Sequence, residues 1–486
     1  MRKVNIFRGL FVVLGTLAAI GSASAASLLE IYQQALQSDP RIHEAEARRL
    51  AALEAEPQAR GVLLPQINAN GDWTRATSDG SGSDNNIDLV DDDNDPNTPP
   101  VLVVTPVSFS VESKDTTKRW QVSLRQTLFR WDQIVGLRRA DKIVAKAEAD
   151  REAAQQDLVI RVGQNYFDVL AAEDRLTASY KNRQAIARQL EQAKQRFDVG
   201  LIAITDVQES QAAYDQAVAG EIAAKRSLAT AREFLREITG EHVDTLSAPG
   251  EEFPMKSPSP AAEKDWVDMA LSQNLSLVSG RLDEKLARDE ISFRRNGRYP
   301  TIDLVANIGN TNQERDQDTG VGFLSTTSDF DGDSISVQFS VPLFTGGTTS
   351  SRVREAVYLH RAAREQLQRI TRETERATRD AYLGVQSEMS RVEALKQAMT
   401  SSETALEATE AGFEVGTRTI VDVLNSQTAL YNATTNYYQA RYDYLMNVLR
   451  LKQAAGSLQI QDLEEIDQWL EARKTPEDTF AEEEAR

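Results

Sequence analysis

The chain has 486 residues, with 55 lysine and arginine residues against 74 aspartate and glutamate residues, and a formal net charge of −19. Because phosphate contacts need clustered positive charge, this acidic balance disfavours a nucleic-acid-binding protein. The sequence contains no cysteine and only three scattered histidines. It therefore excludes a disulfide scaffold, a thiolate metal site and a cysteine nucleophile, and we expect neither a cofactor nor an enzymatic activity.

The first 25 residues are typical of an export signal. Arg2, Lys3 and Arg8 form a positively charged start, residues 10–20 are apolar, and small residues at 23–25 offer a cleavage site. We expect the mature chain to begin near Ala26. No later stretch has the ~18 uninterrupted apolar residues of a transmembrane helix, so any membrane span must consist of strands.

The chain repeats itself at a constant offset of 216 residues. The matching segments are Phe197-Asp198-Val199-Gly200 with Phe413-Glu414-Val415-Gly416, and Ile204-Thr205-Asp206-Val207 with Ile420-Val421-Asp422-Val423. Such self-similarity indicates two tandem halves of similar architecture. We divide the chain into a signal peptide (1–25), a first repeat (26–240), a connector or equatorial region (241–260), a second repeat (261–456) and an equatorial segment with an acidic, disordered tail (457–486).

Each repeat contains an unusually long helical segment. Residues 137–199 hold no proline and one glycine, and their apolar residues recur at three-to-four spacing, which predicts a helix of roughly 60 residues. Residues 348–415 have the same character, and second helices are predicted at 204–237 and 420–455. Gly200 and Gly416 suit the left-handed conformation that ends a helix. The sequence therefore predicts two long helical hairpins with coiled-coil packing.

Segments with alternating apolar and polar residues precede each hairpin, at 67–73, 120–128, 302–308 and 335–343. Each is about ten residues long, the length that a tilted strand needs to cross a bilayer. We predict loops at 78–118 and 310–333. A half-exposed soluble sheet has the same periodicity, but the export signal, the acidic loop, Trp73 and Trp120 favour membrane strands. Because lipid does not tolerate open strand edges, four strands per chain require an oligomer.

The whole pattern resembles the TolC family of outer-membrane efflux proteins. The resemblance covers the mature chain apart from the predicted loops and tail, and its most specific stretches are 63–66, 196–208 and 415–424. It implies an α+β membrane protein in which three copies each give four strands to one twelve-stranded outer-membrane β-barrel. It further implies long α-helical coiled-coil hairpins forming a periplasmic tunnel, a small mixed α/β equatorial domain, and a place in the outer membrane of a Gram-negative type of cell envelope.

The return helices carry an acid six residues after each tip glycine, Asp206 and Asp422. In a trimer each would form a ring of like charges that attracts cations. The resemblance implies that Asp422 is a pore-constriction acid and that Arg418 ties its hairpin to Thr205 and Asp206 of the neighbouring hairpin. An isolated charge would more simply belong to a solvated helix face, but the repeat and the motif together outweigh that interpretation.

Two positions depart from the family pattern. Phe413 stands where the family has a tyrosine of the gate, and Asn425 replaces a second constriction aspartate. We therefore expect weaker closure and a weaker cation block at the entrance.

The resemblance also implies partners. The turns Val199-Gly200-Leu201 and Val415-Gly416-Thr417 would meet a periplasmic adaptor (membrane fusion protein), and an inner-membrane transporter of the RND, ABC or MFS type would act with it. The predicted function is a trimeric exit duct of tripartite efflux or type I secretion systems, embedded in outer-membrane lipid and closed at its periplasmic tip. The alternative is a periplasmic coiled-coil adaptor or scaffold, which would explain the hairpins but not the four alternating segments.

Overall fold

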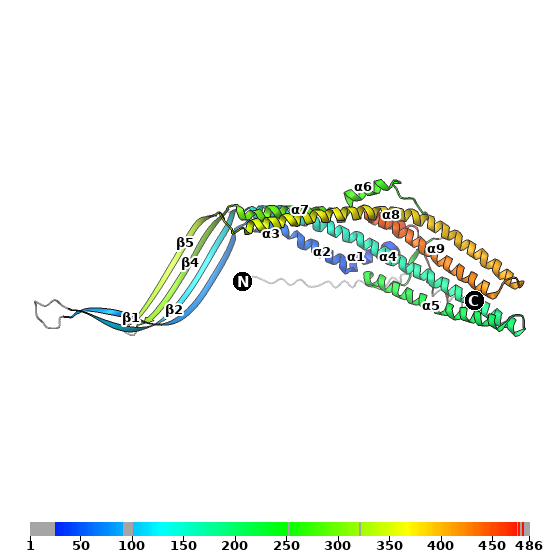
Figure 1. Ribbon diagram of the computed structural model, residues 1–486, viewed down its shortest axis with the longest axis horizontal. Coiled ribbons are helices and arrows are strands. Elements are labelled where there is room, and N and C mark those ends of the chain that lie inside the picture. Colours follow the sequence, from blue (N-terminus) through cyan, green and yellow to red (C-terminus); the bar gives the residue numbers. More distant parts are fainter. Residues whose placement is uncertain are drawn as a thin grey trace, which may run out of the picture. The chain divides into compact units, whose positions relative to one another are not determined.

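A computed structural model of the chain describes residues 25–90, 101–250, 253–319, 322–473, 475–476 and 479–480. Apart from Ala25, the predicted signal peptide lies outside the described residues. The elements follow the order helices, strand pair, helical hairpin, and then repeat that order (Figure 1). The chain divides into two compact units, and each unit draws on both repeats. We name them the sheet unit (Arg49–Ala147 and Arg281–Leu367) and the helical unit (Met1–Arg48, Glu148–Gly280 and Gln368–Arg486).

The sheet unit contains one antiparallel sheet in the order β1-β2-β4-β5. Its strands are β1 (Gln66–Val90), β2 (Val101–Phe129), β4 (Thr301–Asp318) and β5 (Phe323–Ser340). The pairing of β2 with β4 joins the two repeats, with Gln121 opposite Gly309. Within the described residues, β1 pairs only with β2 and β5 pairs only with β4, so each has one open edge.

The strands are longer than the sequence predicted. They span 25, 29, 18 and 18 residues, so the loops predicted at 78–118 and 310–333 are wrong over most of their length. Residues 78–90 pair with 101–113, and 310–318 pair with 323–331; residues 91–100 and 320–321 lie outside the described part. The polar composition was misleading because backbone hydrogen bonds sustain an antiparallel ladder whatever its exposed side chains are.

The apolar alternation of β5 lies on the surface of this sheet. Ile335, Val337 and Phe339 are 76%, 63% and 66% exposed, and they alternate with Ser336 and Gln338. Since successive side chains of a strand point to opposite faces, one face of β5 is apolar and exposed in the single chain.

Four further helices are α2 (Pro40–Leu53), α3 (Ala55–Gly61), α7 (Leu275–Arg294) and the 3₁₀ helix η1 (Arg295–Arg298). By residue number, α3, η1 and most of α7 belong to the sheet unit, and most of α2 belongs to the helical unit. Ion pairs at regular spacing join α4 to α7: Arg139 with Glu290, Lys142 with Asp289, and Lys146 with Asp283. This spacing of three to four residues places the three basic side chains on one face of α4.

The helical unit is built on the two predicted hairpins (Figure 1). Helix α4 (Trp131–Asp198) is followed by α5 (Ile204–Thr239), and α8 (Thr348–Glu414) by α9 (Ile420–Ala455). Their principal core contains Tyr166, Phe167 and Tyr442, all at most 3% exposed. Because the Tyr166 hydroxyl donates 2.6 Å to the Ser247 carbonyl, this buried ring leaves no unsatisfied donor. No helix of the described residues is long and apolar enough to cross a membrane.

A small mixed region completes this unit. It contains α1 (Leu28–Ser38), α6 (Glu263–Gln273), α10 (Ile460–Asp467), and the paired strands β3 (Ser247–Pro249) and β6 (Leu470–Ala472). The prediction of a disordered tail is wrong for Phe480, which is buried and stacks on Tyr180 with 3.8 Å between the ring centroids. An aromatic ring in an acidic segment gains more by covering another ring than by staying in water. Residues 481–486 lie outside the described part.

Candidate functional site at the hairpin tips

The two hairpin tips are built by the same backbone turn. Gly200 and Gly416 have positive φ angles of 73° and 80°, as predicted, and no neighbouring atom lies within 4 Å of the place where a Cβ would be. The amide of Leu201 donates to the Arg196 carbonyl (2.8 Å), and the amide of Thr417 donates to the Gly412 carbonyl (2.8 Å). These bonds satisfy carbonyls at the ends of α4 and α8, where the chain reverses. The left-handed backbone at positions 200 and 416 explains why both residues are glycine.

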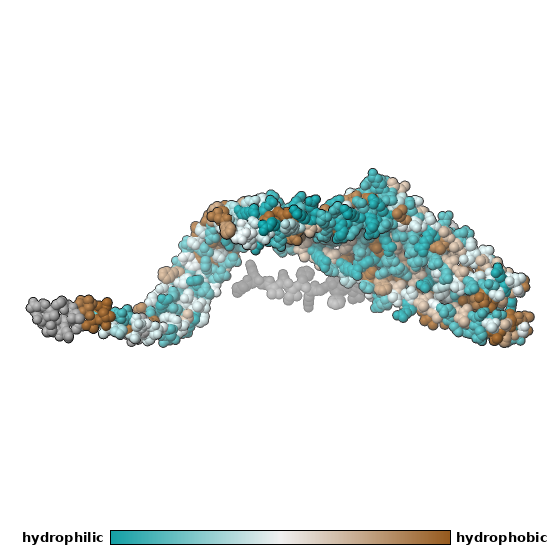
Figure 2. All heavy atoms as spheres, in the orientation of Figure 1, coloured by the Kyte–Doolittle hydropathy of each residue, from teal (hydrophilic) through white to brown (hydrophobic). Residues whose placement is uncertain are grey.

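The tips expose apolar side chains. Val199, Leu201 and Val415 are 71%, 74% and 76% exposed, and Figure 2 shows apolar residues gathered at the ends of the hairpins. Exposed apolar groups that cluster on a surface mark an interaction site more often than singly scattered ones do. The tips therefore have the character of a contact surface.

The two return helices begin differently. Thr419 and Asp422 form a capping box at the start of α9: the Asp422 carboxylate accepts from the Thr419 amide (2.9 Å), and the Asp422 amide donates to the Thr419 hydroxyl (3.3 Å). The hydrogen bonds from Thr419 lower the pKa of Asp422, and the nearby Arg418 lowers it further. Asp206 occupies the same position in α5, but the residue before that helix is Ala203, which has no side-chain oxygen.

Arg418 lies close to the end of its own hairpin. A Cβ on Gly412 would approach the Arg418 Cγ to 2.8 Å, so the absence of a side chain at Gly412 makes room for the arginine. Within the part of one chain that the structure describes, Arg418 forms no ion pair with Asp206 and no hydrogen bond with Thr205. The predicted tie is thus not made within a single chain, and it stays a prediction for a neighbouring one.

Phe413 and Asn425 differ sharply in burial. Phe413 is 8% exposed and packs with Ile420 and Val423 in a small apolar cluster between the hairpins, whereas Asn425 is exposed. The guanidinium of Arg196 lies over the Phe413 ring, with 4.5 Å from Cζ to the centroid. Sequence reasoning missed this contact because residues 196 and 413 belong to different hairpins, and no spacing rule relates them.

A buried charged cluster lies farther from the tips. Glu173 on α4 is 3% exposed, and burial raises its pKa to about 6, against the opposing effect of Arg232, whose guanidinium lies 3.2 Å away. The adjacent Asp174 accepts from the Tyr442 hydroxyl (2.6 Å) and pairs with Arg473. These groups tie α4 to α5, to α9 and to the segment that follows β6.

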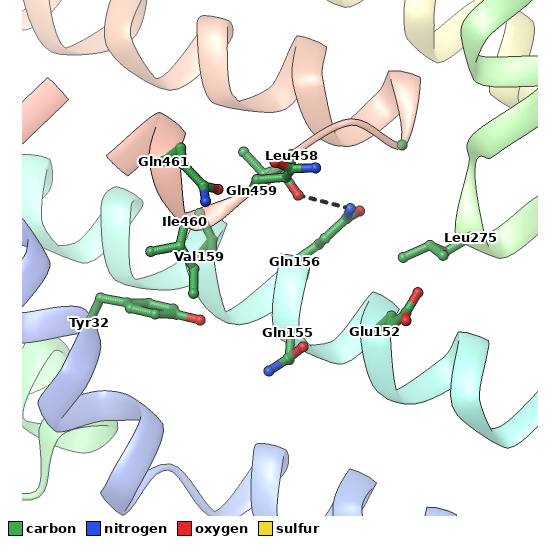
Figure 3. A pocket seen from close by; sticks show the side chains of 11 residues that line it. Tyr32, Glu152, Gln155, Gln156, Val159, Leu275, Leu458, Gln459, Ile460 and Gln461 are labelled. Carbon is green, nitrogen blue, oxygen red and sulfur yellow. Dashed lines mark hydrogen bonds between the residues drawn. The ribbon is translucent and has the colours of Figure 1, made fainter. Parts of the chain in front are cut away.

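The helical unit also has a surface pocket of about 460 Å³ beside α1 and α4 (Figure 3). Its polar groups are mainly glutamine amides, and the Gln156 amide donates to the Leu458 carbonyl (3.1 Å). No predicted site residue lies in it. Within the described ranges, no group of three or more histidine, aspartate and glutamate side chains is placed to hold a metal ion.

The chain is similar to known proteins over most of its length. The chain matches the family described as "Outer membrane efflux protein" over residues 31–241 and 266–457. It is 36% identical over 463 residues to the outer membrane protein TolC of Vibrio cholerae, covering 94% of this chain and 98% of that protein. It is 27% identical over 456 residues to the alkaline protease secretion protein AprF of Pseudomonas aeruginosa, covering 93% and 89%.

Solved structures have a similar fold. The outer membrane protein VceC of Vibrio cholerae is similar with a TM-score of 0.67 at 19% identity, covering 88% of this chain and 96% of that one. The CmeC outer membrane channel of Campylobacter jejuni is similar with a TM-score of 0.69 at 14% identity, covering 97% and 98%.

Proposed function

Since the chain belongs to the family of outer membrane efflux proteins, we propose that three copies form an exit duct that is closed at its hairpin tips until partner proteins open it. The chain is an outer-membrane efflux or secretion channel of the TolC type with an α+β fold, and it is not an enzyme. The alternative of a periplasmic adaptor or scaffold is wrong, because the relatives that match over most of the chain are outer membrane proteins.

The sheet supports the trimeric part of the proposal. In a single chain, β1 and β5 each leave one strand edge unpaired, and β5 exposes its apolar face. Both features raise the free energy of the isolated chain. Lipid does not tolerate unpaired backbone groups, so the edges must pair with other copies. Joining β1 of one copy to β5 of the next would close twelve strands and turn the apolar face toward lipid.

The tips support the gated part of the proposal. The capping box lowers the pKa of Asp422 and holds its carboxylate in one orientation, so three copies would present a ring of fixed negative charges together with Asp206. Arg418 would reach Thr205 and Asp206 of a neighbouring hairpin and hold the entrance shut. With Asn425 in place of a second acid, the entrance would carry one acidic ring from α9, and its cation block would be weak.

The exposed apolar tips support the docking of a partner. Val199-Gly200-Leu201 and Val415-Gly416-Thr417 would receive a periplasmic adaptor, and an inner-membrane transporter of the RND, ABC or MFS type would complete the system. Opening follows if these partners bind the open arrangement of the hairpins more tightly than the closed one. Relatives named for protease secretion cover as much of the chain as TolC of Vibrio cholerae does, 93% against 94%, at a lower identity of 25–27% against 36%. Both efflux and type I secretion are therefore included in the proposal.

Single-channel conductance in a planar bilayer tests the gate. Wild type should give small, cation-selective steps, which grow in Arg418→Ser and lose selectivity in Asp422→Asn. If the charge of Asp422 sets the selectivity, Asp422→Ala should lose selectivity to the same extent as Asp422→Asn. If the helix cap sets it, the two variants should differ in selectivity. Arg226→Ser, on an exposed face of α5, should leave the steps unchanged. Wide wild-type steps that Arg418→Ser leaves unaltered would contradict the gate.

A further inference from the structure

The two hairpins of one chain meet through a cation and an aromatic ring. Arg196 lies in the last turn of α4 and Phe413 in the last turn of α8, and the Arg196 Cζ is 4.5 Å from the centroid of the Phe413 ring. This distance is within the range in which a guanidinium is attracted by the ring quadrupole, and the attraction strengthens as water is removed.

Both partners are placed for a strong contact. Phe413 is 8% exposed and belongs to the apolar cluster with Ile186 and Leu424, so its ring cannot turn away without opening a cavity. Arg196 is half-buried, and among the described residues its side chain forms no ion pair. The ring of Phe413 is therefore the group that orients this cation.

Further contacts connect the same two helices and the adjacent turn. Gln189, two turns before Arg196, donates 3.1 Å to Glu410, which lies one turn before Phe413. The Arg196 carbonyl accepts from the Leu201 amide in the tip turn. A movement of α8 away from α4 would thus break the stack, strain the apolar cluster and remove a bond to Glu410 together.

We propose that Arg196 is a positioning residue of the gate, which clamps the α8–α9 hairpin against the α4–α5 hairpin of the same chain through the ring of Phe413. The inference rests on the proposed function, since it assumes that the hairpins separate when the duct opens. In this arrangement Phe413 contributes to closure, because the Arg196 guanidinium stacks on its ring. This contact does not require a hydroxyl at position 413. Each chain of the trimer would carry one such clamp.

A double-mutant cycle measured by single-channel conductance tests the clamp. Arg196→Gln removes the cation, and Phe413→Leu removes the ring without a change of charge; each should raise the mean conductance at least twofold. The double variant should conduct no more than the larger single variant, because one contact is lost in every case. Phe413→Tyr, which keeps the ring, should conduct no more than wild type, and Arg196→Lys should lie between wild type and Arg196→Gln.

Lys194→Gln is the matched control, because Lys194 is an exposed cation two residues from Arg196, and its conductance should equal that of wild type. Hydrogen exchange of the tip amides provides a second measurement: it should quicken in Arg196→Gln while the amides around Tyr166 stay protected. Additive effects in the double variant, or wild-type conductance in both single variants, would overturn the clamp and leave the duct intact. A wild-type protein without any channel would instead overturn the proposed function.

Discussion

Thr419 and Asp422 are hydrogen-bonded to each other at the start of α9. The Thr419 amide donates to the Asp422 carboxylate, and the Asp422 amide donates to the Thr419 hydroxyl. The equivalent residues in the first repeat are Ala203 and Asp206, and α5 begins without a side-chain cap. The two repeats therefore share a tip turn but differ in how firmly the return helix starts. Of the two acids proposed to face the entrance, only Asp422 has its position held by a helix cap.

Loss of this cap should loosen the first turn of α9. Thr419→Ala removes the hydroxyl acceptor, at an expected cost of about 1 kcal/mol, so amide exchange at residues 421–423 should quicken about fivefold. Ala203→Thr should slow exchange in the first turn of α5, because it completes the same capping box with Asp206. Thr434→Ala, in the middle of α9, is the control and should not affect the first turn. Equal exchange in Thr419→Ala and wild type would argue against the cap.

A side chain at Gly412 should displace Arg418. The Cβ in Gly412→Ala would lie 2.8 Å from the Arg418 Cγ, which is too close, so the arginine stem must shift. The variant should therefore raise single-channel conductance in the same direction as Arg418→Ser. Gly220→Ala, where the Cβ meets nothing within 4 Å, should conduct normally and stabilise α5 by up to about 1 kcal/mol. Normal conductance in Gly412→Ala would mean that the position of Arg418 does not set closure.

Glu173 should make stability depend on pH between about 4.5 and 6. Burial raises its pKa from 4.5 to about 6, so the folded chain holds this proton more tightly than the unfolded chain does. The resulting stabilisation is fully present below pH 4.5 and is lost as the pH rises past about 6, with a total of about 2 kcal/mol. The thermal midpoint of Glu173→Gln, measured across this range in detergent, should lack that decline. Glu237→Gln, on an exposed face of α5, should keep the wild-type slope; a slope retained in Glu173→Gln would assign it to another group.

Gly309 should be essential for joining the two repeats in the sheet. A Cβ at this position would lie 2.5 Å from the Trp120 carbonyl oxygen and 3.1 Å from the Gln121 Cα, so β2 and β4 could not keep their spacing. Gly309→Ala should cost about 1–3 kcal/mol and reduce the yield of folded protein in the outer-membrane fraction. Gly332, its partner on β5, is the matched control, since a Cβ there meets nothing within 4 Å. Equal yields of Gly309→Ala and Gly332→Ala would contradict the close approach.

Local patterns were reliable where the chain's own periodicity sets the structure. The bounds of α5 and α9 lie within two residues of those predicted, because a long apolar stripe and a tip glycine constrain both ends. The sequence predicts β1 and β2 too short, because the polar residues that follow Thr77 predict a loop and the apolar residues of 101–111 lie apart from the alternating segment at 120–128. Both stretches nevertheless pair through their backbones. The acidic composition predicts a disordered tail that includes Phe480, because composition contains no information about a distant ring such as Tyr180.

The sequence by itself determined the repeat, the two hairpins with their glycine turns, the presence of four alternating strands, and the resemblance to outer-membrane efflux proteins, since each is visible as a pattern of residue types along the chain. Only the tertiary structure decided that Arg196 stacks on Phe413, that Gly412 makes room for Arg418, and that Glu173 is buried with Arg232. Arg196 and Phe413 lie on different helices, as do Glu173 and Arg232. Gly412 and Arg418, though near in sequence, lie on opposite sides of a turn. The energies of such contacts depend on distance and burial, which folding alone establishes.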